Sequence, residues 1–197
     1  MSNHTKRGTT RRFAAALAVA LVASVLALAT PAGAKQSVST VRVSGTDRFL
    51  TSTALSAAAT VAGANNTHYV LVNGSSFADA LAAAALAGAK DGTIISLPEG
   101  GAISASATAT MAAATNITIV GGYTALPATV ETTMRTLRPA ATITRVSGGD
   151  RFATAANVAS EIVNGATAGS LAAVNGKKSV FLASGTSFAD AVIAAPG

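Results

Sequence analysis

The chain has 197 residues, a net charge of +6, 50% apolar residues and no cysteine. This apolar content excludes an intrinsically disordered protein, and the lack of cysteine excludes a disulfide framework, thiol catalysis and cysteine-based zinc sites. The length permits one domain or two small ones.

The positive charge would favour a nucleic acid partner if it formed a surface on the folded protein. Four of the 14 basic residues precede residue 35, however, and the remaining 10 face 8 acidic residues, a net charge of +2. The longest basic run after residue 35 is the pair 177–178, and tryptophan is absent. Proteins that bind single-stranded nucleic acid combine basic and aromatic side chains in one groove. The sequence has no such pattern, so we expect no nucleic acid partner.

Residues 1–34 have the three parts of a secretory signal peptide. A basic start is followed by an apolar run at 13–28 and a small-residue site that ends at Ala34. We expect cleavage after Ala34 and a secreted protein without a membrane contact; an uncleaved anchor is the alternative. Arg12 is followed directly by Phe13, which favours the general secretory route over the twin-arginine route.

The rest of the chain alternates apolar β-prone segments with Ala-rich helical segments. Strands are predicted at 40–43, 68–72, 93–97, 116–120 and 141–146, helices at 48–61, 77–87, 104–114 and 127–137, and a loop at 164–178. Strands separated by helices of this length favour right-handed βαβ crossovers and a parallel sheet. The predicted fold class is α/β, a Rossmann-like parallel sheet flanked by helices.

The first of these helices has a clear predicted start and a predicted buried face. Asp47 is a good N-cap residue immediately before it. The helical period places Phe49, Ala54, Leu55 and Ala58 on its inner face.

Two blocks occur twice in the same order. Residues 42–49 (RVSGTDRF) recur as 145–152 (RVSGGDRF), and residues 74–80 (GSSFADA) recur as 185–191 (GTSFADA). Alanine bias does not produce the charged first block twice, so the sequence predicts an internal duplication.

The repeats set the predicted domain boundaries. We expect a signal peptide at 1–34, a first repeat unit at 35–140 and a second unit at 141–197. The second unit reaches only as far as its second block, so we expect it to be incomplete, as in a fragment of a longer protein.

Three glycines lie where strands are predicted to end. Gly74 stands between a strand and a helix, and Gly121 and Gly122 follow another strand. Backbone amides at such positions bind anions, and ligands of open α/β sheets bind at the carboxyl ends of strands. Nucleotide fingerprints are missing, and plain turn glycines are the alternative.

Four charged residues recur in the blocks. Arg48 and Arg151 open helices and present guanidinium groups that suit an acidic ligand. Asp79 and Asp190 lie in the first turn of a helix, where a carboxylate is stabilising. The alternative is structural, with each arginine paired to the aspartate of its own unit.

Catalytic patterns are weak. His68 is the one histidine after residue 34, and a single histidine at a strand start is more typical of structure than of catalysis. There is no G-x-S-x-G. Asp47 and Asp79 leave a glycosidase-type acid pair open, although both fit helix starts better. We expect no enzyme, no cofactor and no metal.

With these motifs the chain resembles the cell wall-binding repeat family, type 2, of exported Gram-positive proteins, S-layer proteins included. The matching motifs are 42–49 with 145–155, 77–87 with 188–191, and 119–122. The resemblance covers essentially the whole chain after the signal segment. It implies Rossmann- or Toprim-like units, usually three, that pack as a pseudo-trimer.

The resemblance also implies a function. It implies non-catalytic, non-covalent attachment to an anionic secondary cell-wall polymer, through arginines and backbone amides at strand ends or unit interfaces, with Arg48, Asp79, Arg151, Asp190, Gly74, Gly121 and Gly122 as candidates. Two alternatives are the targeting region of an amidase-type wall hydrolase and a self-assembling surface-layer subunit. Leu50 departs from the family's small polar residue, while Thr51 and Thr154 keep the nearby hydroxyl.

Overall fold

The computed structural model describes residues 40–64, 67–165, 173–174, 177–178, 182–187, 189 and 192. The predicted signal peptide, Asp190 and most of the predicted loop therefore lie outside the described residues. The chain divides into two compact units, residues 1–41 and 42–197, and the sheet and helices lie in the second.

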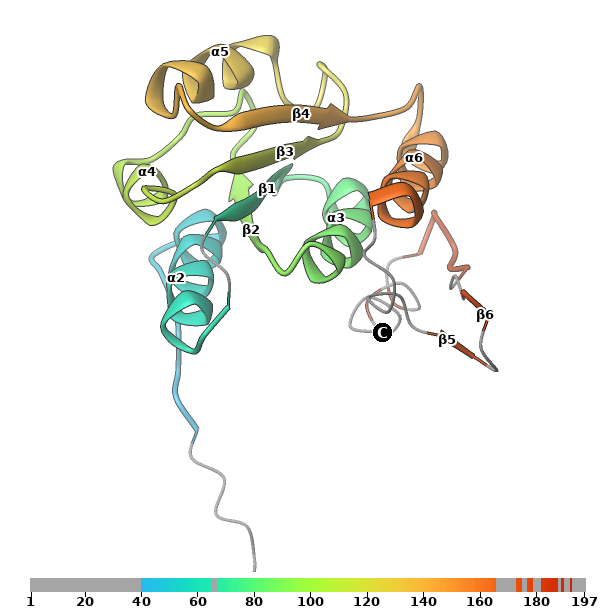
Figure 1. Cartoon of the computed structure of the whole chain (residues 1–197), viewed down its shortest axis with the longest axis horizontal. Helices are drawn as coiled ribbons and strands as arrows, with labels where there is room; N and C mark the ends of the chain where they lie inside the picture. The colour runs from blue at the N-terminus through green and yellow to red at the C-terminus, as the bar shows by residue number, and fades with distance from the viewer. Residues whose placement is uncertain are drawn as a thin grey trace, which may run out of the picture. The chain divides into compact units, whose positions relative to one another are not determined.

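Four parallel strands form one sheet (Figure 1). They are β1 (His68–Asn73), β2 (Thr93–Leu97), β3 (Asn116–Val120) and β4 (Thr142–Val146), in the order β2-β1-β3-β4. The predicted α/β class with a parallel sheet is confirmed. Two further two-residue strands, β5 (Ala173–Val174) and β6 (Lys177–Lys178), pair antiparallel inside the predicted loop.

Five helices accompany the sheet in the part of the chain that the structure describes. They are α2 (Arg48–Val61), α3 (Phe77–Ala89), α4 (Ala105–Thr110), α5 (Ala128–Leu137) and α6 (Arg151–Gly165). Helices α3 and α6 lie side by side on one face, α4 and α5 cover the other, and α2 lies along β2 (Figure 1).

The two faces of the sheet have separate apolar cores, because successive strand residues point to opposite faces. Tyr69 and Leu71 of β1 pack in the first core, against α4 and α5. Val70 and Val72 pack in the second, against α3. Val158 of α6 is 2% exposed in this second core. A helix of the second repeat therefore completes the core of the first.

The predicted strand at 40–43 is not formed. Residues 40–43 have no regular secondary structure, and the Val41 side chain is 83% exposed. The equivalent residues of the second repeat, Thr142–Val146, do form a strand because β3 offers them a parallel edge, with Arg145 opposite Ile119. A strand needs such a partner, whatever its β propensity.

The predicted inner face of α2 is wrong at Leu55, whereas Phe49, Ala54 and Ala58 are half-buried. The buried residues of α2 are Thr53 and Ser56, and Leu55 is 52% exposed. The reason is that α2 faces the edge of β2, whose backbone groups need polar partners. Ser52 Oγ accepts the Ser96 N–H at 2.9 Å and donates to the Ile94 carbonyl at 3.1 Å.

Candidate functional site at the junction of the two repeats

The repeated charged block begins a helix in the same way in both repeats. The Asp47 carboxylate accepts the Leu50 N–H at 2.7 Å, and the Asp150 carboxylate accepts the Ala153 N–H at 2.7 Å. This confirms Asp47 as the N-cap of α2. The aspartates of the two blocks are thus engaged in helix capping.

A second contact fixes the turn before each helix. Thr51 Oγ1 accepts the Gly45 N–H at 2.9 Å, and Thr154 Oγ1 accepts the Gly148 N–H at 2.9 Å. A Cβ on Gly45 would lie 2.5 Å from the Leu50 carbonyl carbon, so the turn requires glycine. The turn and the helix start of the block therefore have the same contacts in both repeats, whereas the residues before the turn form a strand only in the second.

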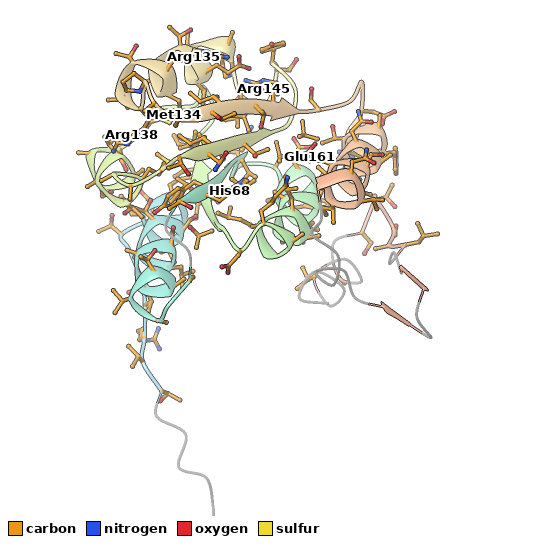
Figure 2. The ribbon with its side chains drawn as sticks, in the orientation of Figure 1. His68, Met134, Arg135, Arg138, Arg145 and Glu161 are labelled. Carbon is orange, nitrogen blue, oxygen red and sulfur yellow. The ribbon has the colours of Figure 1, made fainter. Side chains whose placement is uncertain are left out.

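Arg145 of the second block is built into the first repeat (Figure 2). Its guanidinium donates to Glu131 of α5 at 2.6 Å and to the Gly121 carbonyl at 2.7 Å, and it lies 4.4 Å from the centre of the Tyr123 ring. The side chain is only 8% exposed. Buried, paired and stacked in this way, Arg145 ties β4 to the turn after β3 and to α5.

Arg151 of the same block also faces the first repeat. Its guanidinium lies 5.8 Å from the centre of the Phe77 ring and donates to the Gly185 carbonyl at 3.1 Å. Burial raises the pKa of Asp79, and the positive charge of Arg151 opposes that shift. The described residues show no ion pair between Arg48 and Asp79. The positive charge that acts on Asp79 thus comes from the second repeat, although these residues show no Asp79–Arg151 ion pair either.

Asp79 lies directly against the turn that Arg145 holds. Gly121 has φ of +116°, and a Cβ there would lie 2.7 Å from Asp79 Oδ2. Glycine is therefore required for two reasons: the positive φ disfavours other residues, and the Asp79 carboxylate leaves no room for a Cβ. Gly122, in contrast, has open space around it. We call Phe77, Asp79, Gly121, Gly122 and Arg151 the junction.

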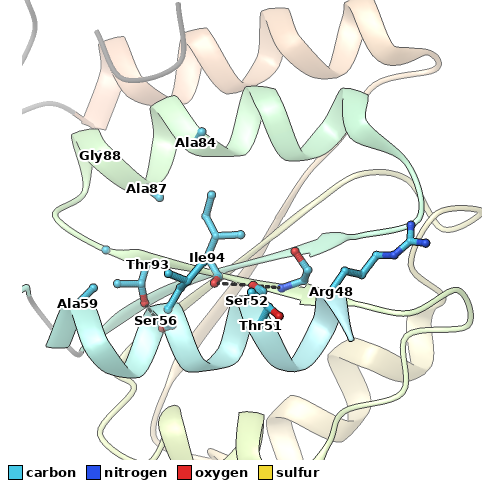
Figure 3. A pocket seen from close by; sticks show the side chains of 13 residues that line it. Arg48, Thr51, Ser52, Ser56, Ala59, Ala84, Ala87, Gly88, Thr93 and Ile94 are labelled. Carbon is cyan, nitrogen blue, oxygen red and sulfur yellow. Dashed lines mark hydrogen bonds between the residues drawn. The ribbon is translucent and has the colours of Figure 1, made fainter. Parts of the chain in front are cut away.

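The other two predicted site residues in the described part, Gly74 and Arg48, both lie near Phe49 of α2. Gly74 leaves room for the Phe49 ring, because a Cβ there would come within 3.0 Å of it. Arg48 is exposed and stands at one end of an open groove of about 620 Å³ between α2 and α3 (Figure 3). Its guanidinium lies 5.7 Å from the centre of the Phe49 ring.

Sequence reasoning missed Phe77 of the junction and three residues around its turn, Arg145, Tyr123 and Glu131. The sequence did offer a signal for Arg145, because Arg42 and Arg145 occupy the same position of the two repeated blocks. Tyr123 and Glu131 carried no signal, since neither lies in a repeated motif. Their role depends on a contact between repeats, and a sequence pattern within one repeat does not reveal such a contact.

His68, the histidine among the described residues, contacts the neighbouring strand β3. His68 Nε2 lies 3.1 Å from Thr118 Oγ1, and burial and the charge of Lys90 lower the pKa of His68. Within the described ranges no three potential metal ligands come together. In the same ranges no helix has the length and apolar character of a membrane span. His68 thus acts as a packed, hydrogen-bonded side chain.

The fold and the junction define a class of protein with tandem α/β repeats, in which the charged block of the second repeat completes the parallel sheet and core of the first. The sequence matches the family described as cell wall binding domain 2 over residues 42–131 and 145–196. These segments make up well over half of the chain, which therefore belongs to this family of cell wall-binding domains.

Two solved structures have the same architecture. Cwp6 from Clostridium difficile matches with a TM-score of 0.56 and 23% identity, over 68% of this chain and 22% of its own. Cwp8 from Clostridium difficile matches with a TM-score of 0.50 and 28% identity, over 59% of this chain and 19% of its own. This chain thus spans about a fifth of each solved chain. A comparison with curated protein sequences gave no match.

Proposed function

We propose that the protein is an exported, non-catalytic module that attaches non-covalently to an anionic secondary polymer of the cell wall. Membership of the cell wall-binding family supports attachment to the wall. The observation that carries the choice of an anionic ligand is the junction, where Arg151 remains exposed although it lies between two repeats.

The groups of the junction suit an acidic saccharide chain. A guanidinium binds phosphate or carboxylate with two parallel hydrogen bonds. Phe77 is 42% exposed beside Arg151 and offers an apolar face to a sugar ring. The half-buried Asp79 carboxylate can accept sugar hydroxyls, and the open space around Gly122 lets a polymer approach the backbone.

Arg48 belongs to the same proposal as a second site. It occupies in the first block the place that Arg151 has in the second, and it is exposed. No residue equivalent to Phe77 or Asp79 faces it among the described residues. We therefore expect Arg48 to contribute less than Arg151 to binding by this chain. Asp190 would serve a junction that involves residues outside the described ranges.

One alternative has an observation in its favour. The matched region is about a fifth of each of the two solved chains, so in those proteins the module is joined to other parts. A targeting region for a wall hydrolase fits such an arrangement. The module would bind the same polymer in that case, and the hydrolase activity would reside elsewhere.

Retention on purified cell walls tests the proposal. The chain from residue 35 onward should sediment with intact walls and should remain in solution with walls from which the anionic polymer has been extracted. Adding the extracted polymer should release it from intact walls. Equal retention on intact and extracted walls would show that the ligand is another wall component.

A further inference from the structure

We propose that the ring of Tyr123 is a stacking surface for a sugar ring of the wall polymer, and that it makes the site select a saccharide over other anions. The inference rests on the proposed function, because it concerns the same ligand. It adds a contact with the uncharged part of that ligand, whereas Arg151 of the junction meets the acidic part.

Tyr123 has one covered and one open ring face. The Arg145 guanidinium lies over the ring, 4.4 Å from its centre. Tyr123 is nevertheless 61% exposed, and the Arg145 side chain that covers it is only 8% exposed. Solvent therefore reaches the ring from the side opposite Arg145, and the ring presents a flat apolar face to it.

The covered face is held in place by a side chain that is itself fixed. Arg145 donates to Glu131 at 2.6 Å and to the Gly121 carbonyl at 2.7 Å. A cation positioned over an aromatic ring attracts it, so the buried guanidinium favours one orientation of the ring. A side chain that is ordered before binding loses little conformational freedom when the ligand arrives.

The backbone around Tyr123 is fixed as well. The Gly122 carbonyl accepts the N–H groups of Ala125 and Leu126, both at 3.0 Å, and Leu126 is fully buried. Asn73 of β1 donates its side-chain N–H to the Ala125 carbonyl at 3.0 Å. The turn thus holds an exposed tyrosine on an ordered frame, which is how binding sites obtain contact area at a low entropic cost.

Tyr123 lies next to the junction. It directly follows Gly121 and Gly122, and two peptide units of about 3.8 Å each keep its Cα within about 7.6 Å of the Gly121 Cα. Gly122, between them, has open space around it. A polymer that approaches the backbone at Gly122 therefore also reaches the ring of Tyr123.

The shape of the open face indicates the chemical class of the ligand. A sugar ring has a flat side of C–H groups that packs on an aromatic face, and its hydroxyl groups stay at the rim to form hydrogen bonds. A chain of phosphate groups alone has no such flat side. The site therefore fits an acidic polymer that contains sugar rings.

Tyrosine fluorescence tests the contact directly, because the chain has two tyrosines and no tryptophan. Tyr69 is 0% exposed, and its hydroxyl donates to the Thr110 carbonyl, so acrylamide should quench mainly Tyr123. The extracted anionic wall polymer should lower this quenching at least twofold in the chain from residue 35 onward. Inorganic polyphosphate should not lower it. In Tyr123→Phe, which leaves Tyr69 as the fluorophore, the polymer should have no effect.

Calorimetric titration with the same polymer separates stacking from a merely structural role. Tyr123→Phe keeps the ring and should bind within about twofold of the wild type. Tyr123→Ala should bind about fivefold more weakly, and so should Tyr123→Leu, which covers Arg145 without a flat ring. Both losses should persist at high salt, because stacking is not screened. Val61→Ala removes another exposed apolar side chain and should have no effect.

The outcomes distinguish this inference from the proposed function. Polymer binding with unchanged quenching, or with wild-type affinity in Tyr123→Ala, would overturn the inference and leave the proposed function standing. Equal protection of Tyr123 by polyphosphate would overturn the assigned sugar ring. Neither binding heat nor protection with the wall polymer would overturn both.

Discussion

Arg145 shows how one side chain joins the two repeats. Its charge is buried to 8% exposure, and two hydrogen bonds and a tyrosine ring satisfy most of the guanidinium. A charge in such a place is stable only while its partners remain, because an unpaired buried charge is costly. The recurring arginine of the block is therefore explained by contacts between repeats.

The first prediction concerns this arginine. Arg145→Ala should lower the free energy of unfolding by about 3 kcal/mol, since it leaves Glu131 without its close partner. Arg135→Ala is the matched control, because that side chain is 63% exposed and lies 4.0 Å from the same glutamate; its effect should stay below about 0.5 kcal/mol. Urea denaturation measures both, and equal effects would contradict the role of Arg145.

The second prediction concerns the pH dependence of stability. Burial lowers the pKa of folded His68 below its ordinary value of 6.5, so the unfolded chain binds the proton more readily than the folded one. The stability contributed by neutral His68 is thus fully present above pH 6.5 and is lost as the pH falls through that value towards the lowered pKa.

Thermal unfolding of the wild type and of His68→Gln checks this sign. The wild type should lose more stability than the variant when the pH is lowered from neutral to about one unit below 6.5. Parallel curves for the two proteins would mean that another group titrates in this range.

At the scale of elements, the sequence predicts most of the fold well. Strands β2 and β3 have the predicted bounds, because continuous apolar runs between glycine or proline turns identify buried parallel strands. The segment 40–43 and Leu55 of α2 were predicted wrongly for one shared reason. The structure of both depends on their neighbours. Residues 40–43 have no strand edge to pair with among the described residues, and α2 faces the polar edge of β2.

The same limit applies to the candidate site. The sequence identified Asp79, Gly121 and Arg151 as recurring or turn residues, and the structure brings them together. It did not predict that the charge acting on Asp79 is that of the arginine of the other repeat, because equivalent pairs within a unit and between units have the same sequence pattern.

A pair of adjacent glycines gives the third prediction. Gly121→Ala should cost about 1–3 kcal/mol of stability, because φ is +116° and the new Cβ would meet Asp79. Gly122→Ala should change stability by less than about 0.5 kcal/mol, since nothing lies near it. Comparable losses for the two variants, measured by chemical denaturation, would refute this account of the turn.

The equivalent helix residues Val158 and Leu55 give the fourth prediction. Val158→Ala should destabilise the protein by about 2 kcal/mol, because it opens a cavity in the second core. Leu55→Ala should be neutral to within about 0.5 kcal/mol, because Leu55 is half exposed in this chain. Thermal unfolding of both variants measures these effects. If Val158→Ala did not change the stability, α6 would not be part of the first repeat's core.

At the scale of the whole molecule, the repeats are units of sequence but not of structure. By sequence β4 and α6 open the second repeat, yet they supply an edge strand and a core helix to the first. The family match begins at the charged block in both repeats, at residues 42 and 145. Tandem units linked in this way stabilise one another as neighbours in a repeat protein do.

The position of the arginines matters more for binding an anion than the net charge of the molecule. After the segment 1–34 the net charge is only +2, so general attraction to anions is weak. The arginines instead occupy fixed places, with Arg145 inside the fold and Arg151 exposed at the junction. Attraction to an acidic polymer should therefore come from Arg151 at the junction rather than from the net charge.

Calorimetric titration of the extracted anionic wall polymer into the chain from residue 35 onward tests this claim most directly. Arg151→Ala should weaken binding about tenfold, the loss of about 1.4 kcal/mol, while Arg135→Ala, which removes an equally positive exposed side chain, should stay within about twofold. Equal affinities for the wild type and Arg151→Ala, or equal losses in both variants, would contradict binding at the junction.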